Sequence, residues 1–235
     1  MRNLTILAAL GLAAAAGTAN AGVTSTVTLT NDYDFRGITQ TDEDPAIQAS
    51  VDFATDSGWY IGAWASNVDF PGYDGDIELD LYTGFTGSTG EDGLTWDAGL
   101  IWYTYPTSDG DDVNSEIPDF PEIYGSLAYG MFKGKVWYSN DFGGTDESSF
   151  YLDTSVTVPL PSNFSILGHV GYSDGDAIDI LYGDSYTDYS VGVGYAAGKF
   201  SLALKFVGTD GVDDSLGLDD SRAVFTIATT FPWSE

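Results

Sequence analysis

An isolated arginine stands in the acidic segment NDYDFRGITQTDED, residues 31–44. The whole chain has only seven lysines and arginines, so the position of Arg36 is informative. A guanidinium among carboxylates can form bidentate ion pairs that brace a fold. It can also form the cationic wall of a constriction that selects ions by charge. If residues 23–36 form a strand, alternation puts Asp32, Asp34 and Arg36 on one face.

Arg222 is the second candidate of this kind. It opens a segment in which Ala223, Phe225 and Ile227 share the opposite face, so Arg222 is predicted to point inward with Arg36. If the first and last strands close a barrel, the two arginines lie at the seam, near Asp32, Asp34, Asp219 and Asp220. Two interpretations stay open and are compatible: a network that fixes the seam, and a rim that sets selectivity.

Other charged residues also fall on the predicted inward face. We expect the acidic members to predominate and to make the lining favourable for cations. The predicted inward acids are Asp52, Glu78, Asp80, Asp97, Glu122, Asp153 and Asp188, and the predicted inward base is Lys205.

Most remaining acidic residues lie in long polar segments between the predicted strands. One cluster, Asp109, Asp111, Asp112 and Glu116, has the oxygen-rich character that suits Ca²⁺ or Mg²⁺, but not the spacing of an EF-hand loop. Solvated loop charge and weak divalent binding are the two hypotheses for it. The divalent ion could then bridge to lipopolysaccharide phosphates. No cofactor site is predicted.

Catalytic chemistry has little support in the residues. His169 is the single histidine and has no serine or carboxylate at a spacing typical of nucleophilic catalysis. The glycine-rich stretch at 192–198 lacks the spacing of a dinucleotide fingerprint. We therefore predict that the protein is not an enzyme, with an outer-membrane lipase or protease as the alternative.

The elements that must position these residues are predicted to be β-strands. Apolar and polar residues alternate with period two along most of the chain, as in Ile47, Ala49, Val51 and Phe53. Glycine and aromatic residues are abundant, which disfavours long helices. About twelve strands are expected, near 23–36, 46–55, 58–68, 77–87, 93–105, 120–131, 134–141, 149–159, 163–173, 187–196, 199–208 and 221–231.

The connections between these strands alternate between short turns and long acidic loops. This arrangement is typical of outer-membrane barrels, which have short periplasmic turns and long outer loops. The fold class predicted is therefore all-β: a closed up-and-down antiparallel transmembrane β-barrel. A soluble periplasmic β-barrel or sandwich is the alternative. Aromatic residues near the expected strand ends, among them Tyr33, Phe35 and Trp102, favour the membrane barrel as interfacial girdles.

The beginning of the chain has the features of a secretory signal peptide. A basic residue, an apolar run and Ala19-Asn20-Ala21 follow in order, so residues 1–21 are predicted to be removed and 22–235 to form one barrel domain. There are no cysteines, which excludes disulfides. The formal net charge of −29 argues against nucleic-acid partners. Adaptation to a salty habitat is an alternative reason for that acidity.

Several blocks of this sequence resemble the TorF-type family of exported proteobacterial proteins, which are classed as outer-membrane porins and otherwise have no known function. The blocks are NDYDFRGITQ at 31–40, PAIQ at 45–48, SNVDF at 66–70, IELDLY at 77–82 and YTYP at 103–106. The resemblance covers residues 22–235 and implies an outer-membrane location and a passive pore. It implies no solute and no functional residues.

Together these observations predict a narrow diffusion channel for small hydrophilic solutes or ions, with a preference for cations. Its expected surroundings are outer-membrane lipid and lipopolysaccharide, and its oligomeric state stays open. A non-conducting structural or adhesive barrel with ion-binding loops is the main alternative. Whether the loop at 106–119 or the loop at 208–221 folds inward to close the lumen also stays open.

Overall fold

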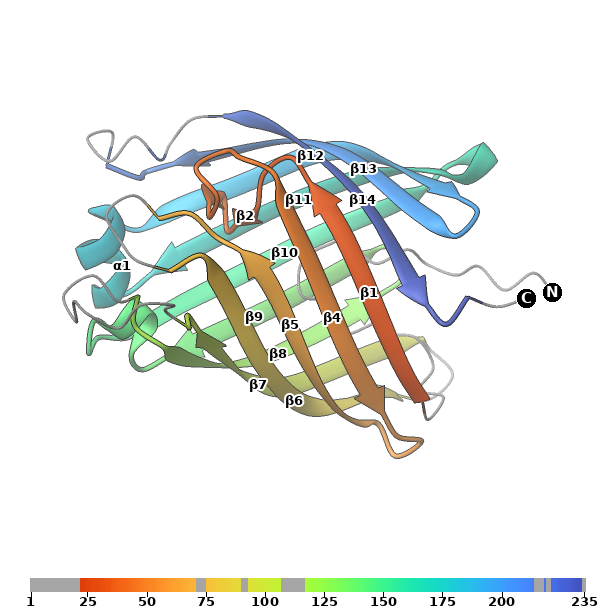
Figure 1. Cartoon of the computed structure of the whole chain (residues 1–235), viewed down its shortest axis with the longest axis horizontal. Coiled ribbons are helices and arrows are strands. Elements are labelled where there is room, and N and C mark those ends of the chain that lie inside the picture. The colour runs from red at the N-terminus through yellow and green to blue at the C-terminus, as the bar shows by residue number, and fades with distance from the viewer. Residues whose placement is uncertain are drawn as a thin grey trace.

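The computed structural model describes residues 22–70, 75–89, 93–106, 117–213, 218 and 221–233. Twelve antiparallel strands close into a barrel in the order β1-β14-β13-β12-β11-β10-β9-β8-β7-β6-β5-β4, and a separate two-stranded hairpin, β2-β3, lies between β1 and β4 in sequence (Figure 1). The strands are β1 (Gly22–Thr30), β2 (Asp34–Phe35), β3 (Ile38–Thr39), β4 (Ala46–Ala54), β5 (Trp59–Asn67), β6 (Ile77–Thr89), β7 (Leu94–Thr104), β8 (Phe120–Tyr129), β9 (Phe132–Ser139), β10 (Ser149–Pro159), β11 (Phe164–Asp174), β12 (Tyr186–Ala197), β13 (Phe200–Asp210) and β14 (Arg222–Phe231). The predicted closed barrel of twelve strands is thereby confirmed.

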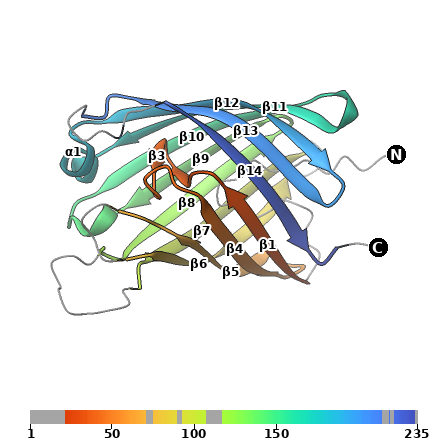
Figure 2. The ribbon, with the colours of Figure 1, turned by 45° about the horizontal axis from the view of Figure 1, so that its top comes forward.

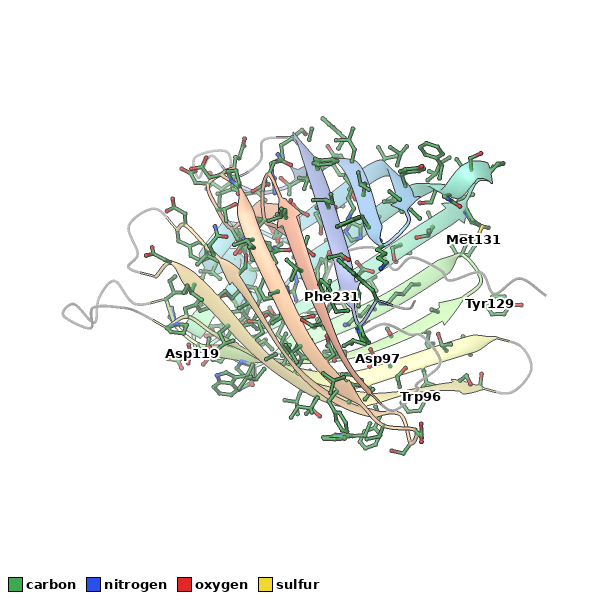
Figure 3. The ribbon with its side chains drawn as sticks, turned by 45° about the vertical axis from the view of Figure 1, so that its right-hand side comes forward. Trp96, Asp97, Asp119, Tyr129, Met131 and Phe231 are labelled. Atoms are coloured by element: carbon green, nitrogen blue, oxygen red, sulfur yellow. The ribbon has the colours of Figure 1, made fainter. Side chains whose placement is uncertain are left out.

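Period-two alternation in the sequence sets which residues face inward. In β6 the inward residues Glu78, Asp80 and Tyr82 are buried, whereas Leu81 and Phe85 between and beyond them are more than half exposed on the outside. The same pattern repeats around the barrel, and side chains project from its outer surface in Figure 3. The barrel therefore has a polar interior and an apolar exterior, the reverse of a water-soluble protein.

The connections differ at the two ends of the barrel. Short turns join β4 to β5, β8 to β9 and β12 to β13. Tyr129 and Met131 mark one of these turns, and Asp119 lies at the other end of β8 (Figure 3). The start of β1 and the end of β14 lie at the end with the short turns, opposite the helix α1 (Asp176–Tyr182) (Figure 1). No helix in the described part of the chain is long and apolar enough to cross a membrane.

The first predicted strand, 23–36, is too long. β1 ends at Thr30, because the side chain of Asn31 takes over the hydrogen bonds to β14: its amide donates to the carbonyl of Ala223 (3.0 Å) and accepts from the backbone N–H of Phe225. Residues 31–45, hereafter the inward segment, then leave the wall. Ile38 of β3 is 3% exposed, and Figure 2 shows β3 within the outline of the barrel.

A two-residue turn shapes the inward segment. Phe35 pairs with Ile38, and Arg36 and Gly37 between them have φ values of +52° and +84°. Positive φ at both positions is what the tightest hairpins require. A side chain at position 37 would collide with Thr209 and Asp188 on the barrel wall, so glycine is needed there for a second reason.

Because of this turn, two residues of the predicted aromatic girdle do not lie on the outer surface. Tyr33 is 7% exposed and Phe35 packs against the buried aromatic cluster, so both lie inside the barrel. Trp102, Tyr129 and Tyr172 are at least 40% exposed on the outer surface, as a girdle needs.

The signal peptide predicted for residues 1–21 lies outside the described residues. So do Asp109, Asp111, Asp112 and Glu116, the divalent-ion candidates, and Asp219 and Asp220, the predicted neighbours of the seam.

Candidate functional site: the lumen and its inward segment

Arg222 ties the inward segment to the closing seam of the barrel. β14 pairs with β1 from Ser25↔Phe231 to Thr30↔Thr226, which places Arg222 beside the point where the inward segment begins. Its guanidinium donates to Asp32, to Asp34 (2.6 Å) and to the carbonyl of Gly37 (2.8 Å). Asp32 and Arg222 are buried at 2% and 8% exposure. The predicted network of arginine and carboxylates at the seam is therefore present for Arg222.

Arg36 has a different role from the one predicted. Its Nη2 lies 2.6 Å from Oε2 of Glu122 on β8, across the barrel from β1, and the two side chains are 5% and 0% exposed. Arg36 thus crosses the lumen instead of pairing with carboxylates at the seam. The error follows from the overlong first strand, since a strand would have held Arg36 against the wall on which it started.

Aromatic rings enclose the Arg36 guanidinium. Its Cζ lies 4.4 Å from the ring centre of Tyr151, 5.4 Å from Phe142 and 5.6 Å from Trp137, within the range of cation–π attraction. Burial pulls the pKa of Arg36 down, but Glu122 and the nearby Tyr103 and Tyr151 together raise it above its ordinary value. The guanidinium therefore stays charged in a dry environment.

The wall from β4 to β8 carries a ladder of tyrosines and carboxylates. Tyr82 donates to Asp52, Tyr60 donates to Asp97 (2.6 Å), and Tyr60 and Tyr124 lie 2.5 Å apart. These phenols hold the carboxylates in fixed positions along the lumen.

Two inward acids, Glu78 and Asp80, lie deeper in the protein than expected for a water-lined wall. Glu78 accepts a hydrogen bond from Tyr33 (3.1 Å) and is 1% exposed. Asp80 is fully buried, and neither of its oxygens has a hydrogen-bond partner among the described residues. Within the described residues, no group of three His, Cys, Asp or Glu side chains is arranged to hold a metal ion.

His169 and Asp153 form a second network on the opposite wall. Nδ1 of His169 lies 3.0 Å from Asp153, and Nε2 lies 2.6 Å from Asp188. Both ring nitrogens can donate only as imidazolium. The sequence spacing did not reveal these partners, because Asp153 and Asp188 are on β10 and β12, and strand register alone brings them to β11.

Replacing His169 with alanine is expected to destabilise the barrel by about 1–3 kcal/mol, because two carboxylates lose a charge-assisted partner. Unfolding in urea, followed by tryptophan fluorescence of the detergent-refolded barrel, measures this change. The matched control is Ser190→Ala, at the position that faces His169 on β12. An unfolding midpoint for His169→Ala equal to that of the control would show that the network adds no stability.

Lys135 is an inward cation that the sequence prediction did not name. Its Nζ lies 3.7 Å from the ring centres of both Tyr124 and Trp137, and the residue is 7% exposed. Alternation along β9 could have identified it, since it precedes the outward residue Val136. Lys205 was predicted correctly to face inward: it lies between Leu204 and Phe206, which are about half exposed outside.

Apolar residues close the outer end of the lumen. Ile38 of the inward segment packs in one cluster with Phe142 of the 3-10 helix η2 (Phe142–Gly144), Ile178 of α1 and Val212. Each of these residues is at most 5% exposed. In this conformation the mouth is occluded by the inward segment, which the sequence did not identify as a plug, together with η2, α1 and Val212. Residues 107–116 of the candidate loop at 106–119 lie outside the described part of the chain.

Fold and site together define a closed twelve-stranded β-barrel with an acidic, occluded lumen. The chain belongs to the family described as "Bacterial protein of unknown function (Gcw_chp)", whose model matches residues 14–231. No protein with a curated description matches it.

Three of the solved structures that superpose on this barrel are named as porins or as an outer-membrane channel. The KdgM porin superposes with a TM-score of 0.54 at 5% identity, covering 91% of this chain and all of that one. The NanC porin gives 0.53 at 12% identity, over 90% and 100%. The COG4313 outer membrane channel from Pseudomonas putida F1 gives 0.52 at 8% identity, over 92% and 98%. At such low identity the likeness concerns the fold alone.

Proposed function

We propose that this protein is an outer-membrane channel for passive diffusion of small hydrophilic solutes, with a preference for cations and an outer mouth that opens and closes. The observation that carries the proposal is the polar, carboxylate-rich lumen inside an apolar barrel surface. An apolar exterior is stable against lipid. Fixed charges inside a barrel can select ions or solutes that pass along a water-filled path. Membership of the TorF-type porins and removal of residues 1–21 as a signal peptide belong to the same proposal.

The cation preference rests on the charges that face the lumen. Among the described residues, nine carboxylates face or enter it, against six basic residues; the acids are Asp32, Asp34, Asp52, Glu78, Asp80, Asp97, Glu122, Asp153 and Asp188, and the bases are Arg36, Lys133, Lys135, His169, Lys205 and Arg222. With all of these groups charged, the lining is net negative. Anionic solutes are then repelled from the path and cations are concentrated in it.

Single-channel current in a planar bilayer tests the function. The refolded protein should give discrete steps whose reversal potential in a salt gradient is that of a cation-selective pore. Asp97→Asn should move the reversal potential toward zero, whereas the exposed loop variant Glu147→Gln should not. A folded barrel with no current under any condition would reject the channel.

A non-conducting structural barrel is the second candidate. The occluded mouth favours it, because Ile38, Phe142 and Ile178 leave the apolar cluster almost no exposed surface. Such a barrel would stay silent even when the inward segment is removed, and that separates the two functions.

Acidification is expected to hold the inward segment more firmly in the lumen. Burial raises the pKa of Asp34 from an ordinary value of 3.8 to about 6, although the Arg222 guanidinium pulls it the other way. The docked carboxyl binds its proton more tightly than the undocked one, so docking gains stability as pH falls through about 6. Since 29% of this side chain is exposed, about a tenfold shift toward the closed form between pH 7 and pH 5 is an upper bound.

Open probability at the two pH values measures this shift. Asp34→Asn should remove the part of the pH response that Asp34 causes, and Asp42→Asn, an exposed carboxylate of the same segment, serves as the control. Current that rises on acidification, or an unchanged response in Asp34→Asn, would contradict the prediction.

A further inference from the structure

The surroundings of Arg36 form a binding site that does not depend on Arg36 itself. Trp137 of β9, Phe142 of η2, Tyr151 of β10 and Glu122 of β8 enclose its guanidinium; we call these four residues the cage. None of them belongs to the inward segment. Tyr103 donates to Glu122 (3.0 Å) and holds its carboxylate in place. If Arg36 leaves, three rings and a carboxylate remain around the space.

Arg36 occupies the cage imperfectly. Only Nη2 pairs with the carboxylate of Glu122; Nη1 of Arg36 and Oε1 of Glu122 are both buried without a hydrogen-bond partner. A guanidinium that is free to orient can make two parallel hydrogen bonds to a carboxylate. Arg36 also has a φ of +52°, a conformation that residues other than glycine adopt at a cost. Arg36 is held in the cage by the backbone at the cost of a hydrogen bond and an unfavourable φ. A free guanidinium without these costs can therefore replace it.

We propose that the cage binds the guanidinium group of an organic cation that enters the lumen, and that Arg36 is its built-in competitor. This inference deepens the proposed function, on which it rests, by naming the class of solute. Binding of the solute displaces Arg36 together with Phe35 and Ile38, which carry the inward segment's part of the occluding cluster. The solute thereby shifts the segment toward the open position, as any ligand does that binds one of two conformations.

The chemistry of the cage discriminates among solutes. Aromatic faces and a single carboxylate attract a planar, delocalised and weakly hydrated cation. A neutral urea of the same shape has no charge to offer, and an anionic solute is repelled by Glu122. Lys135 also lies against Trp137, with its Nζ 3.7 Å from the ring centre, so this ring already contacts a second cation.

Calorimetric titration of the folded barrel in detergent tests the proposal without any need for conduction. The probes are argininamide and its isostere citrullinamide, which has the same α-amino group but a neutral urea in place of the guanidinium. Arg36→Ala should bind argininamide at least ten times more tightly than the unaltered protein, because the competitor is gone, and citrullinamide should bind neither. Adding Glu122→Gln, or Trp137→Leu, to Arg36→Ala should weaken argininamide binding at least tenfold. Adding Asp52→Asn, a lumen carboxylate outside the cage, should leave it within twofold.

A second measurement keeps Arg36 in place. The chain has no cysteine, so Ile38→Cys introduces a unique thiol at a position that is 3% exposed. Argininamide, and not citrullinamide, should speed its reaction with a thiol reagent severalfold. Folded Arg36→Ala that fails to bind argininamide, equal binding of the two probes, or no change in thiol reactivity would each overturn the proposal. If the cage binds argininamide in a barrel that never conducts, the channel function is rejected and the cage proposal stands. If the barrel conducts but the cage does not bind argininamide, the cage proposal is rejected and the channel function stands.

Discussion

Replacing Arg222 with alanine is expected to lower the free energy of unfolding by about 3–5 kcal/mol, the cost of leaving buried carboxylates without their cation. Asp32 is 2% exposed, and it also accepts hydrogen bonds from the hydroxyls of Thr39 and Thr41. The same guanidinium holds Asp34 and the carbonyl of Gly37. One substitution therefore removes the charge balance of the seam and the anchor of the inward segment.

The unfolding midpoint in urea, with retention of the compact band on unheated gels, measures this loss. Lys199→Ala is the matched control, since Lys199 is exposed near the end of β14, against Trp233, and should change stability by less than about 0.5 kcal/mol. Arg222→Lys keeps the charge without the planar fork and should fall between the two. Adding Asp32→Asn to Arg222→Ala should restore part of the stability, because the two sites are coupled. A midpoint for Arg222→Ala close to that of Lys199→Ala would show that the seam network is not needed for the fold.

Replacing residues 33–41 with the linker Gly-Ser-Gly is expected to turn an occluded barrel into an open one. The change removes Phe35, Arg36 and Ile38 from the lumen. It leaves the wall intact, because Thr30 of β1 is already paired with Ala46 of β4 and a shorter loop can join the two strands. Current through the pore should rise at least severalfold, and steps should persist for longer at the open level.

This prediction is tested by comparing the single-channel conductance of the shortened chain with that of the unaltered chain. The control is Asp42→Gly with Glu43→Gly, which removes two exposed charges from the same segment. Both residues have positive φ, so glycine fits there, and the lumen should stay closed. If the shortened barrel folds and conducts no better than the control, the result supports the non-conducting structural barrel and contradicts the prediction.

The alternation of apolar and polar residues along the sequence was enough to predict most of the strands of this barrel. Strand β10 was predicted at 149–159 and lies there, because alternating apolar and polar residues are a property of neighbours along the chain. The same rule placed Asp52, Glu78, Asp97 and Glu122 inside, and the alternation of short and long connections indicated a barrel.

Alternation failed where the chain leaves the sheet. The alternation runs from Val27 to Arg36 with Asn31 as its one exception, since a strand facing lipid and a hairpin folded into the lumen both put polar and apolar residues on opposite faces. The backbone ends the strand at Asn31, whose side-chain bonds reach β14. One polar residue in an apolar position does not reveal these partners, which lie 192 and 194 positions away.

What the sequence determined by itself is thus which residues face inward, and what only the tertiary structure decided is which of them meet. Glu122 is 86 positions from Arg36 and Arg222 is 190 from Asp32. His169 gains its two carboxylates from the register of three strands. Closing the barrel and folding the inward segment across it bring these charges together, because partners in a lumen are chosen by the geometry of the closed wall and not by spacing along the chain.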